Sequence, residues 1–400
     1  MMENFNYFNP VKMLFGKGQI DNLTDEILPY GKRVLLVYGQ HHLKDTGLYE
    51  KVVSQFAKAG ITWFELEGVH PNPRYRLVED GINICRQENI EFVLGIGGGS
   101  VSDTAKAVAI GTRMDSDIWD AYEDFNYAMH DPAKVPKHTV GDVLPFGIVM
   151  TKAGTGSEFD YTSVLSRRET QEKLMIIDKR IYAKFCIDDP ALTLTTPLQE
   201  SMYGVADIMT HFLEQYFSPS KNTLVLDGIK EGQLKAVIAA GRRVQENLND
   251  YDARSYLLYA AAWACADQNM CGATPEWSSH LIEHELSAQT DLNHGHGMAI
   301  VYSGWMPYVL EAIPERFAQY AQNVWGIERK GRTDVELGRE GIEKTKEFWR
   351  SLGITLTLSE AGVDEKYIGS IASQAMRFGA VGSAKALSEA AISEILYSVK

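Results

Sequence analysis

Two pairs of side chains in the second half of the chain have the chemistry and spacing of metal ligands. Asp207 and His211 are four positions apart, and so are His280 and His284. Residues four apart lie on one face of a helix, so the members of each pair can reach the same ligand. A carboxylate and imidazoles together suit a divalent ion of intermediate softness. The first pair alone is equally typical of a buried hydrogen bond, but two pairs in one region favour a metal site.

The second pair has a rival interpretation. His280, Glu283 and His284 match the H-x-x-E-H pattern of inverted zincin peptidases, in which the glutamate is the general base. Five-residue patterns recur by chance, and a peptidase has no use for the glycine-rich turn described next, so this is the lower alternative. His294 and His296 follow in a turn with flanking glycines. Spacing alone leaves open which of these histidines would bind the ion.

A glycine-rich turn separates a predicted strand from a predicted helix in the first half of the chain. Its glycines are Gly95, Gly97, Gly98 and Gly99, and Ser100 follows them. Glycine lets a backbone approach a phosphate closely and adopt positive φ, while a helix N-terminus presents N–H groups and a partial positive charge. The spacing lacks the last glycine of the usual dinucleotide fingerprint, so tight-turn glycines without a ligand are the alternative. We expect the turn to hold the phosphates of an anionic cofactor.

The first predicted strand also ends in a turn that bears on the cofactor. NAD-specific sites usually place an acidic residue after a strand, where it binds the ribose 2′-hydroxyl. Gly39 and Gln40 stand at that place, and His41, His42 and Lys44 follow. This place holds no carboxylate that would repel a 2′-phosphate, which favours NADP over NAD. The alternative is an ordinary surface loop with two solvated histidines.

Short apolar runs alternate with helical patterns in the first half of the chain. The ranges expected to be strands are 33–39, 61–68 and 91–97, and those expected to be helices are 46–60, 75–90 and 102–112. Strands separated by helices of this length predict a parallel sheet with helices on both faces. The expected fold class is therefore α/β, with a doubly wound, mainly parallel, dinucleotide-binding sheet.

From near residue 190 the pattern becomes almost entirely helical. Thr196 is a good N-cap, Pro197 suits the first helical position and Gln199 completes a capping box, so a helix is expected to begin there. We expect two domains. Residues 1–190 form the α/β dinucleotide-binding domain, and residues 191–400 form a helical metal-binding domain.

The composition excludes several classes of function. The 400-residue chain has 39 Lys and Arg against 53 Asp and Glu, a net charge of −14, so nucleic acid and anionic membranes are poor partners. It lacks a signal-peptide pattern, and it lacks an uncharged apolar run of the roughly 18 residues that a membrane span needs. Its four cysteines form no C-x-x-C pair, which is typical of thiols in a reducing compartment. We expect a cytoplasmic protein.

Together these motifs resemble those of the iron-containing alcohol dehydrogenases, a metal-dependent family that shares its fold with glycerol dehydrogenase and dehydroquinate synthase. The resemblance runs essentially from end to end and is strongest to the butanol dehydrogenase type. It is carried by FNYFNPVKMLFGKG, YGQHHLKDTGLYEKV, GGGSVSDTAK, TKAGTGSE, the pair Asp207-x-x-x-His211, and His280-x-x-x-His284 with His294 fourteen residues beyond His280.

The resemblance implies a complete set of site residues. Four side chains would bind one Fe²⁺ or Zn²⁺ ion: Asp207, His211, His280 and His294. His284 would line the substrate pocket beside the ion. NADP, with NAD also possible, would be bound by residues from the turns above and from the resemblance: Gly39, Gln40, Gly97, Gly98, Gly99, Ser100, Asp103, Thr151, Thr155 and Lys173. Asp103 would fall near the nicotinamide, and the chain would form a homodimer.

The expected reaction is hydride transfer between NAD(P)H and a small aldehyde or primary alcohol of the butanal and butanol type. The metal would polarise the carbonyl group, and a proton would arrive from solvent through His284, so that His284 and Asp103 are the candidate catalytic residues. One alternative is a dehydroquinate-synthase-like lyase that uses NAD transiently. That enzyme needs many basic residues around its substrate, and the region near the histidines has few. A non-catalytic metal- or nucleotide-binding protein is the other alternative.

Overall fold

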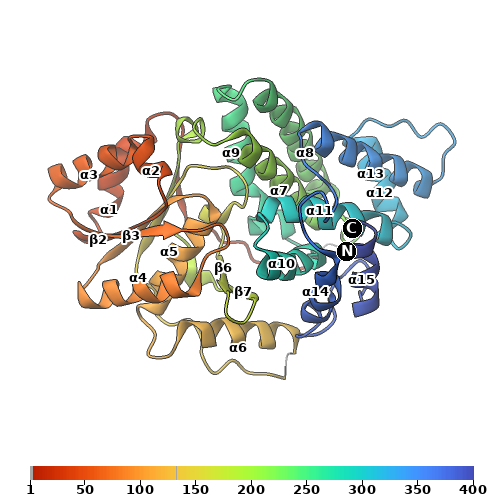
Figure 1. Ribbon diagram of the computed structural model, residues 1–400. Coiled ribbons are helices and arrows are strands. Elements are labelled where there is room, and N and C mark those ends of the chain that lie inside the picture. Colours follow the sequence, from red (N-terminus) through yellow and green to blue (C-terminus); the bar gives the residue numbers. More distant parts are fainter. Residues whose placement is uncertain (1–2, 132) are drawn as a thin grey trace. The chain divides into compact units, whose positions relative to one another are not determined.

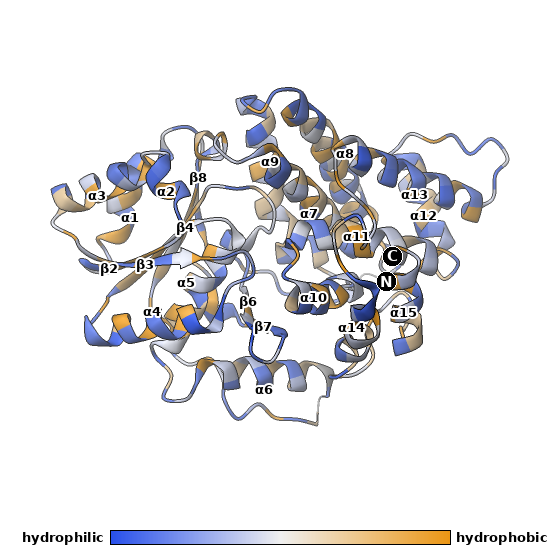
Figure 2. Cartoon of the chain, in the orientation of Figure 1, coloured by the Kyte–Doolittle hydropathy of each residue, from blue (hydrophilic) through white to orange (hydrophobic). Residues whose placement is uncertain are grey.

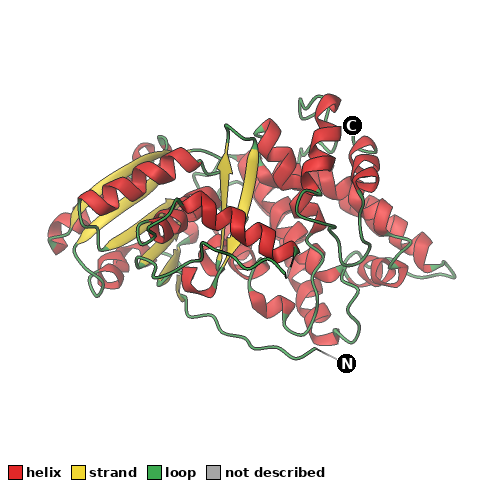
Figure 3. Cartoon of the chain, turned by 90° about the horizontal axis from the view of Figure 1, so that it is seen from below, coloured by secondary structure: helices red, strands yellow, loops and turns green. Residues whose placement is uncertain are grey.

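A computed structural model describes residues 3–131 and 133–400, and it divides the chain into two compact units. One unit is Phe8–Thr196, and the other is Pro197–Lys400 together with the chain up to Tyr7. Strands are confined to the first unit among the described residues, while the second is built of helices (Figure 3). The predicted α/β domain followed by a helical domain is confirmed as the fold class.

The α/β unit is built on a six-stranded parallel sheet. Its strands lie in the order β1-β8-β5-β4-β2-β3, and a separate antiparallel hairpin pairs β6 with β7. The strands are β1 (Lys12–Phe15), β2 (Arg33–Gly39), β3 (Thr62–Val69), β4 (Phe92–Gly97), β5 (Phe146–Met150), β6 (Thr162–Arg167), β7 (Glu172–Ile177) and β8 (Phe185–Asp188). After β3 the chain crosses to the other side of β2, so the order reverses beside β2 and β4. Ligands of doubly wound sheets bind at such a reversal, beyond the carboxyl ends of the strands.

Helices cover both faces of this sheet (Figure 1). They are α1 (Leu23–Ile27), α2 (His42–Asp45), α3 (Leu48–Ala59), α4 (Tyr75–Gln87) and α5 (Gly99–Gly111), while α6 (Ile118–His130) packs against β7 of the hairpin. Because both faces are covered, five consecutive residues of β2 are buried, as is typical of parallel sheets. Val52 and Phe56 of α3 pack against Val34 and Leu36 of β2 in one core cluster. Helix α4 is striped with polar and apolar residues (Figure 2), which fits its single buried face.

The helical unit begins with a long buried helix that carries part of the site. Its helices are α7 (Leu198–Tyr216), α8 (Leu224–Glu246), α9 (Tyr251–Ala264), α10 (Ser278–Thr290), α11 (His294–Val309), α12 (Pro314–Asn323), α13 (Asp334–Ser351), α14 (Ile368–Ala375) and α15 (Glu389–Tyr397). Helices α10 and α11 both pack against neighbours in this unit, α11 against α7 and α10 against α11. No helix in the described part of the chain has the length and apolar character needed to cross a membrane.

The predicted start of the helical half is wrong in detail. Helix α7 begins at Leu198, and its N-cap is Pro197, which offers no side-chain hydrogen bond. The N-cap therefore lies one residue later than predicted, and the Thr196 hydroxyl donates to the backbone oxygen of Thr151, at 2.9 Å. The two compact units meet in sequence at Thr196 and Pro197.

Candidate metal centre and cofactor site

The metal-ligand candidates come from three helices of the helical unit. Asp207 and His211 lie on α7, His280 and His284 on α10, and His294 is the first residue of α11. The glycines that follow His294 explain how α11 reaches its neighbours. A Cβ atom on Gly295 would lie 2.3 Å from the backbone oxygen of Tyr203 in α7, and one on Gly297 would lie 2.8 Å from Oε1 of Glu283 in α10. Only glycine permits packing this close.

Three of the four predicted ligands converge. Asp207, His280 and His294 each offer one ligand atom, and these atoms all lie within 4.8 Å of one another. Nε2 of His294 is 3.5 Å from Oδ1 of Asp207, and the His280 and His294 ring centroids are 5.5 Å apart. Such distances are those of side chains that can surround one ion.

The donor atoms are also available for a metal. Oδ1 of Asp207 and Nε2 of His280 are buried, and neither has a hydrogen-bond partner among the described residues. Buried polar atoms are normally satisfied, so orphans that point at one centre need an explanation. Burial alone would raise the pKa of Asp207, but the neighbouring His211 and His294 rings outweigh it and lower this pKa. Burial also lowers the pKa of His280, so an anionic oxygen and a neutral imidazole are offered, and this donor set fits a divalent metal.

His211 lies at the edge of this group. Its ring centroid is 4.5 Å from that of His280, and its Nδ1 donates to the backbone oxygen of Asp207 at 2.8 Å. That bond leaves Nε2 as the ring atom that could bind an ion. His211 is not among the three residues whose ligand atoms lie within 4.8 Å of one another, so its role as a ligand stays a prediction.

His284 and His296 differ in their surroundings. His284 is buried, its ring centroid lies 5.9 Å from that of His294, and it forms a second close group with Glu283 and His294. His296 turns elsewhere: its Nε2 lies 2.8 Å from Oγ1 of Thr355, and its ring stacks on Tyr203. This geometry supports His294 rather than His296 as the ligand of α11.

Two buried glutamates contact the ligand histidines, and the sequence reasoning missed both roles. Glu214 of α7 binds Nδ1 of His280, and Glu283 of α10 binds Nδ1 of His294. Both glutamates are fully buried. Glu214 could have been found, because residues 207, 211 and 214 follow the i, i+4, i+7 spacing of a single helix face. Glu283 was noticed only as a candidate peptidase base, and here it holds a histidine from the next helix.

The glycine-rich turn lies where β4 meets α5. A Cβ atom on Gly97 would lie 2.4 Å from Cγ2 of Val101, and one on Gly99 would lie 2.4 Å from Oγ1 of Thr155. Gly98 is different, because its nearest neighbour would be Cβ of Lys152 at 3.6 Å, an ordinary contact. Gly98 is also the N-cap of α5 and provides no side-chain cap, so the helix end offers its N–H groups to an anion. The turn therefore fits a phosphate-bearing cofactor.

The glycines of this turn do not use the left-handed conformation that glycine permits. None of its glycines is among those with positive φ, and Gly98 has φ −95°. The glycines are needed for close packing of the turn against α5 and the 151–158 loop rather than for a left-handed backbone. The reason is that β4 runs into α5 without a reversal that would require such a conformation.

The other predicted cofactor residues surround the same strand ends. Thr151 follows β5 and donates its N–H to the backbone oxygen of Gly97 at 2.9 Å. Thr155 contacts Gly99, and Ser100 lies in the first turn of α5. Asp103, one turn further, accepts a hydrogen bond from the Ser157 hydroxyl at 2.9 Å, and burial raises its pKa to about 7.

Lys173 lies on the hairpin strand β7 rather than in the main sheet. It is buried, and its Nζ donates to Oδ1 of Asn72 at 3.0 Å. Its charge is among those that oppose the rise in the pKa of Asp103, so the two side chains act on each other electrostatically. Whether Lys173 also binds the cofactor stays a prediction.

The turn after β2 is less positive than its sequence indicates. Gly39 and Gln40 end the strand, and Gln40 contacts the His70 ring at 3.3 Å. Lys44 forms an ion pair of 2.7 Å with Glu67 on the neighbouring strand β3. This pairing could not be inferred from the turn alone, and it offsets the positive charge of Lys44.

A buried acid pair lies beside the 151–158 loop. Glu158 and Asp188 are fully buried, and neither oxygen of Glu158 accepts a hydrogen bond from another described residue. Burial, reinforced by the charge of Asp188, raises the pKa of Glu158, and burial raises the pKa of Asp188 to about 7. The folded unit therefore retains a proton that the unfolded chain releases above its ordinary pKa near 4.

The acid pair predicts a pH-dependent stability. Because the folded state binds more protons, the free energy of unfolding falls as pH rises from about 4 to about 7. Asp188→Asn removes the contribution of Asp188 and the negative charge that it places near Glu158. We expect the variant to melt a few degrees above the parent at pH 8, with little difference at pH 4. Calorimetry across that range would contradict this account if both proteins followed the same pH profile.

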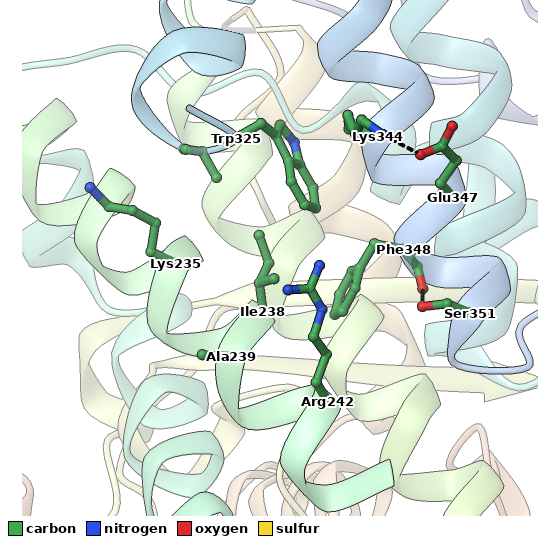
Figure 4. Close-up of a pocket in the computed structure, with 10 residues that line it drawn as sticks. Lys235, Ile238, Ala239, Arg242, Trp325, Lys344, Glu347, Phe348 and Ser351 are labelled. Atoms are coloured by element: carbon green, nitrogen blue, oxygen red, sulfur yellow. Dashed lines mark hydrogen bonds and ion pairs between the residues drawn. The ribbon is translucent and has the colours of Figure 1, made fainter. Parts of the chain in front are cut away.

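A pocket of about 550 Å³ lies elsewhere in the helical unit (Figure 4). Residues of α8, α13 and the segment after α12 line it, among them Arg242, Trp325 and Phe348. The Arg242 guanidinium lies over the Phe348 ring, 5.5 Å from its centroid. None of the metal-ligand candidates lines this pocket, so it is not part of the centre described above.

Comparisons with known proteins agree with this geometry. The sequence of residues 10–190 matches the protein-family model for iron-containing alcohol dehydrogenases. Residues 201–399 match the family model for the C-terminal part of Fe-containing alcohol dehydrogenases. A probable NADH-dependent butanol dehydrogenase of Bacillus subtilis is 40% identical, with 99% of each chain covered. The NADPH-dependent aldehyde reductase of Escherichia coli is 31% identical over 91% of this chain and 90% of its own. The crystal structure of a Thermotoga maritima NADH-dependent butanol dehydrogenase superposes with a TM-score of 0.93 at 35% identity, covering 100% of this chain and 99% of the other.

Proposed function

This chain belongs to the iron-containing alcohol dehydrogenase family, and from that premise we propose that it reduces a small aldehyde of about the size of butanal and oxidises the matching primary alcohol. It is a metal-dependent alcohol dehydrogenase and aldehyde reductase that uses a nicotinamide cofactor. The observation that best supports a metal-dependent reaction is the convergence of Asp207, His280 and His294, with orphaned donor atoms on Asp207 and His280. Relatives named as butanol dehydrogenases support the size of the substrate.

Each group of residues has a defined task in this proposal. When bound, the metal supplies Lewis acidity toward a carbonyl oxygen, and the reduced nicotinamide supplies the hydride. Asp207, His211, His280 and His294 would hold the ion. The name of the family favours iron, and zinc suits the same donor set. Gly97–Ser100 would hold the pyrophosphate at the N-terminus of α5. The proposed metal ligands thus belong to the helical unit and the proposed pyrophosphate residues to the α/β unit.

Proton handling is assigned to side chains close to these groups. His284 is buried beside His294, and an imidazole exchanges protons near neutral pH, so it is the proposed carrier of the proton that completes the alcohol. Asp103 has a pKa of about 7 and lies near the cofactor turn. We assign it a supporting role at the nicotinamide, where it holds the Ser157 hydroxyl in place.

We propose that NADP is preferred over NAD, with the preference residing at Gly39 rather than Lys44. The absence of a carboxylate after β2 favours a 2′-phosphate. Pairing of Lys44 with Glu67 weakens the electrostatic support for that phosphate. The relatives are named for either cofactor, since the Bacillus protein carries NADH in its name and the Escherichia coli protein carries NADPH.

Gly39→Asp is expected to shift the preference toward NAD. A Cβ at this position would meet only the backbone oxygen of Val69, at 3.8 Å, so the new side chain fits without distorting the turn. Its charge should repel the 2′-phosphate and lower the ratio of kcat/KM for NADPH to that for NADH by about tenfold or more, or ~1.4 kcal/mol. Gly39→Asn is the matched control, because it adds the same volume without the charge. An unchanged ratio in the aspartate variant would show that this turn does not read the ribose.

The proposed reaction is tested by adding butanal to the purified holoenzyme with NADPH or NADH and following the nicotinamide absorbance. Oxidation of the cofactor supports the proposal. Equal oxidation of the cofactor when no aldehyde is added would contradict it. So would the absence of any reaction with a panel of short aldehydes. The dehydroquinate-synthase-like alternative predicts no net change in nicotinamide.

Two further expectations belong with this proposal. The chain is proposed to act in the cytoplasm and to form a homodimer. Light scattering of the purified protein measures the second directly, and a monomeric mass would contradict it.

A further inference from the structure

Two buried carboxylates, Glu214 and Glu283, contact the proposed ligands His280 and His294. We propose that Glu214 and Glu283 are positioning residues that hold His280 and His294 with a proton on Nδ1, so that Nε2 of each ring faces the ion. This inference rests on the proposed ligand set. It adds the residues that orient the ligands and predicts how they change metal affinity.

Glu214 performs two tasks with one carboxylate. Its Oε1 accepts hydrogen bonds from the backbone N–H groups of Ser279 at 2.8 Å and His280 at 3.2 Å, at the N-terminus of α10. That end has no side-chain cap of its own, because its N-cap residue is Trp277. The other oxygen, Oε2, binds Nδ1 of His280. Helix placement and ring orientation therefore depend on the same group.

Glu283 contacts the proposed ligand on helix α11. It is fully buried on α10, and its Oε2 binds Nδ1 of His294, the first residue of α11. The absence of a side chain on Gly297 lets α11 approach, since a Cβ there would lie 2.8 Å from Oε1 of Glu283. A carboxylate on α7 thus orients a proposed ligand on α10, and a carboxylate on α10 orients a proposed ligand on α11.

The chemistry of imidazole explains why these contacts matter. A neutral ring carries one proton, so a carboxylate that accepts a hydrogen bond from Nδ1 leaves the lone pair on Nε2. The geometry agrees, because Nε2 of His280 has no hydrogen-bond partner among the described residues and Nε2 of His294 faces Oδ1 of Asp207. Carboxylates in this position also raise the basicity of the ligand, and removing such groups typically weakens metal affinity by 10- to 100-fold.

Glutamine at position 214 cannot reproduce both tasks. Its single carbonyl oxygen could cap α10, but its NH₂ group would then face Nδ1 of His280 and favour the tautomer with the proton on Nε2. In the opposite orientation the NH₂ group would face the two backbone N–H groups. Glu214→Gln is therefore expected to weaken metal binding even though it is nearly isosteric.

The experiment measures metal binding rather than turnover alone. The parent, Glu214→Gln and Glu283→Gln are stripped of metal, and the dissociation constants for Zn²⁺ and Co²⁺ are measured by competition with a chelator. We expect each constant to rise by about 10- to 100-fold, with altered visible bands of the Co²⁺ form. Melting of the metal-free proteins separates loss of folding from loss of positioning. The two variants lie on different helices, so one remains informative if the other fails to fold.

Glu276→Gln provides the matched control. Glu276 is a buried carboxylate in the same unit, and its Oε2 accepts hydrogen bonds from the backbone N–H groups of Ser383 at 2.8 Å and Ala384 at 2.6 Å. It touches no ligand histidine in any described contact, so its loss should lower the melting temperature without changing the dissociation constant or the Co²⁺ spectrum.

The outcomes separate this inference from the proposed function. If the parent binds one ion per chain and both glutamine variants bind it equally tightly with the same spectrum, the positioning roles are overturned while the function stands. If the parent binds no metal and still reduces butanal, the metal centre and the positioning roles are overturned while the aldehyde reduction stands. A selective loss of affinity in the two variants, and not in Glu276→Gln, supports the inference.

Discussion

Replacing His280 with alanine is expected to abolish metal binding and turnover while leaving NADPH binding intact. His280 contributes an orphaned, buried Nε2 to the group with Asp207 and His294, so its removal takes away a donor that no neighbour replaces. Lewis-acid catalysis contributes several kcal/mol, so kcat should fall by about a thousandfold or more, or ~4 kcal/mol. Metal analysis and a steady-state assay with butanal measure the two effects. Fluorescence titration with NADPH checks the cofactor.

His296→Ala is the control for this experiment. His296 lies on the same helix as His294, but its Nε2 bonds to Thr355 and its ring stacks on Tyr203. Its loss should cost stability and leave one ion per chain. If His280→Ala retained full activity after its metal had been removed, the assignment of the centre would be refuted.

Gly98→Ala is expected to impair cofactor binding without harming the fold. The backbone of Gly98 has φ −95°, which alanine adopts readily, and a Cβ there would meet only Lys152 at 3.6 Å. The protein thus has room for a methyl group, but the phosphates of a cofactor must approach this backbone closely. We expect the dissociation constant for NADPH to rise about tenfold or more, or ~1.4 kcal/mol, at an unchanged melting temperature.

Two comparisons sharpen the Gly98 experiment. Gly99→Ala would mix the two effects, since its Cβ would lie 2.4 Å from Oγ1 of Thr155 and disturb the turn itself. Gly232→Ala, in α8, has no atom within 4 Å of its Cβ, so it should leave the dissociation constant for NADPH unchanged. It should raise the melting temperature slightly, because alanine favours a helix more than glycine does. NADPH binding by Gly98→Ala as tight as that of the parent would place the pyrophosphate elsewhere.

Local patterns predicted those features that depend on residues near one another in sequence. The buried run of β2 and the four-residue spacing of Asp207 and His211 can be predicted from the periodicity and polarity of the sequence alone. The α/β domain followed by helices was predictable for the same reason. Helix α3 ends at Gly60, which adopts the left-handed conformation that such a stop signal requires.

The features that were missed depend on contacts between distant segments. Thr196 looks like a helix cap, but its hydroxyl binds Thr151, which lies 45 positions earlier. Lys44 looks like a free cation until Glu67 is brought beside it on β3. Glu214 sits on the face of α7 that carries Asp207 and His211, yet its task becomes visible only when α10 places His280 against it. In each case a tertiary partner decides the role, and sequence spacing carries no record of that partner.

The central claim is that one metal ion per chain makes this protein an aldehyde reductase. The protein is stripped of metal, reconstituted without oxygen with increasing Fe²⁺ or Zn²⁺, and assayed with butanal and NADPH or NADH after each addition. The account predicts that the stripped protein is inactive and that activity rises with added metal until one ion is bound per chain. Full nicotinamide-dependent activity in the stripped protein, unaffected by added metal, would contradict it.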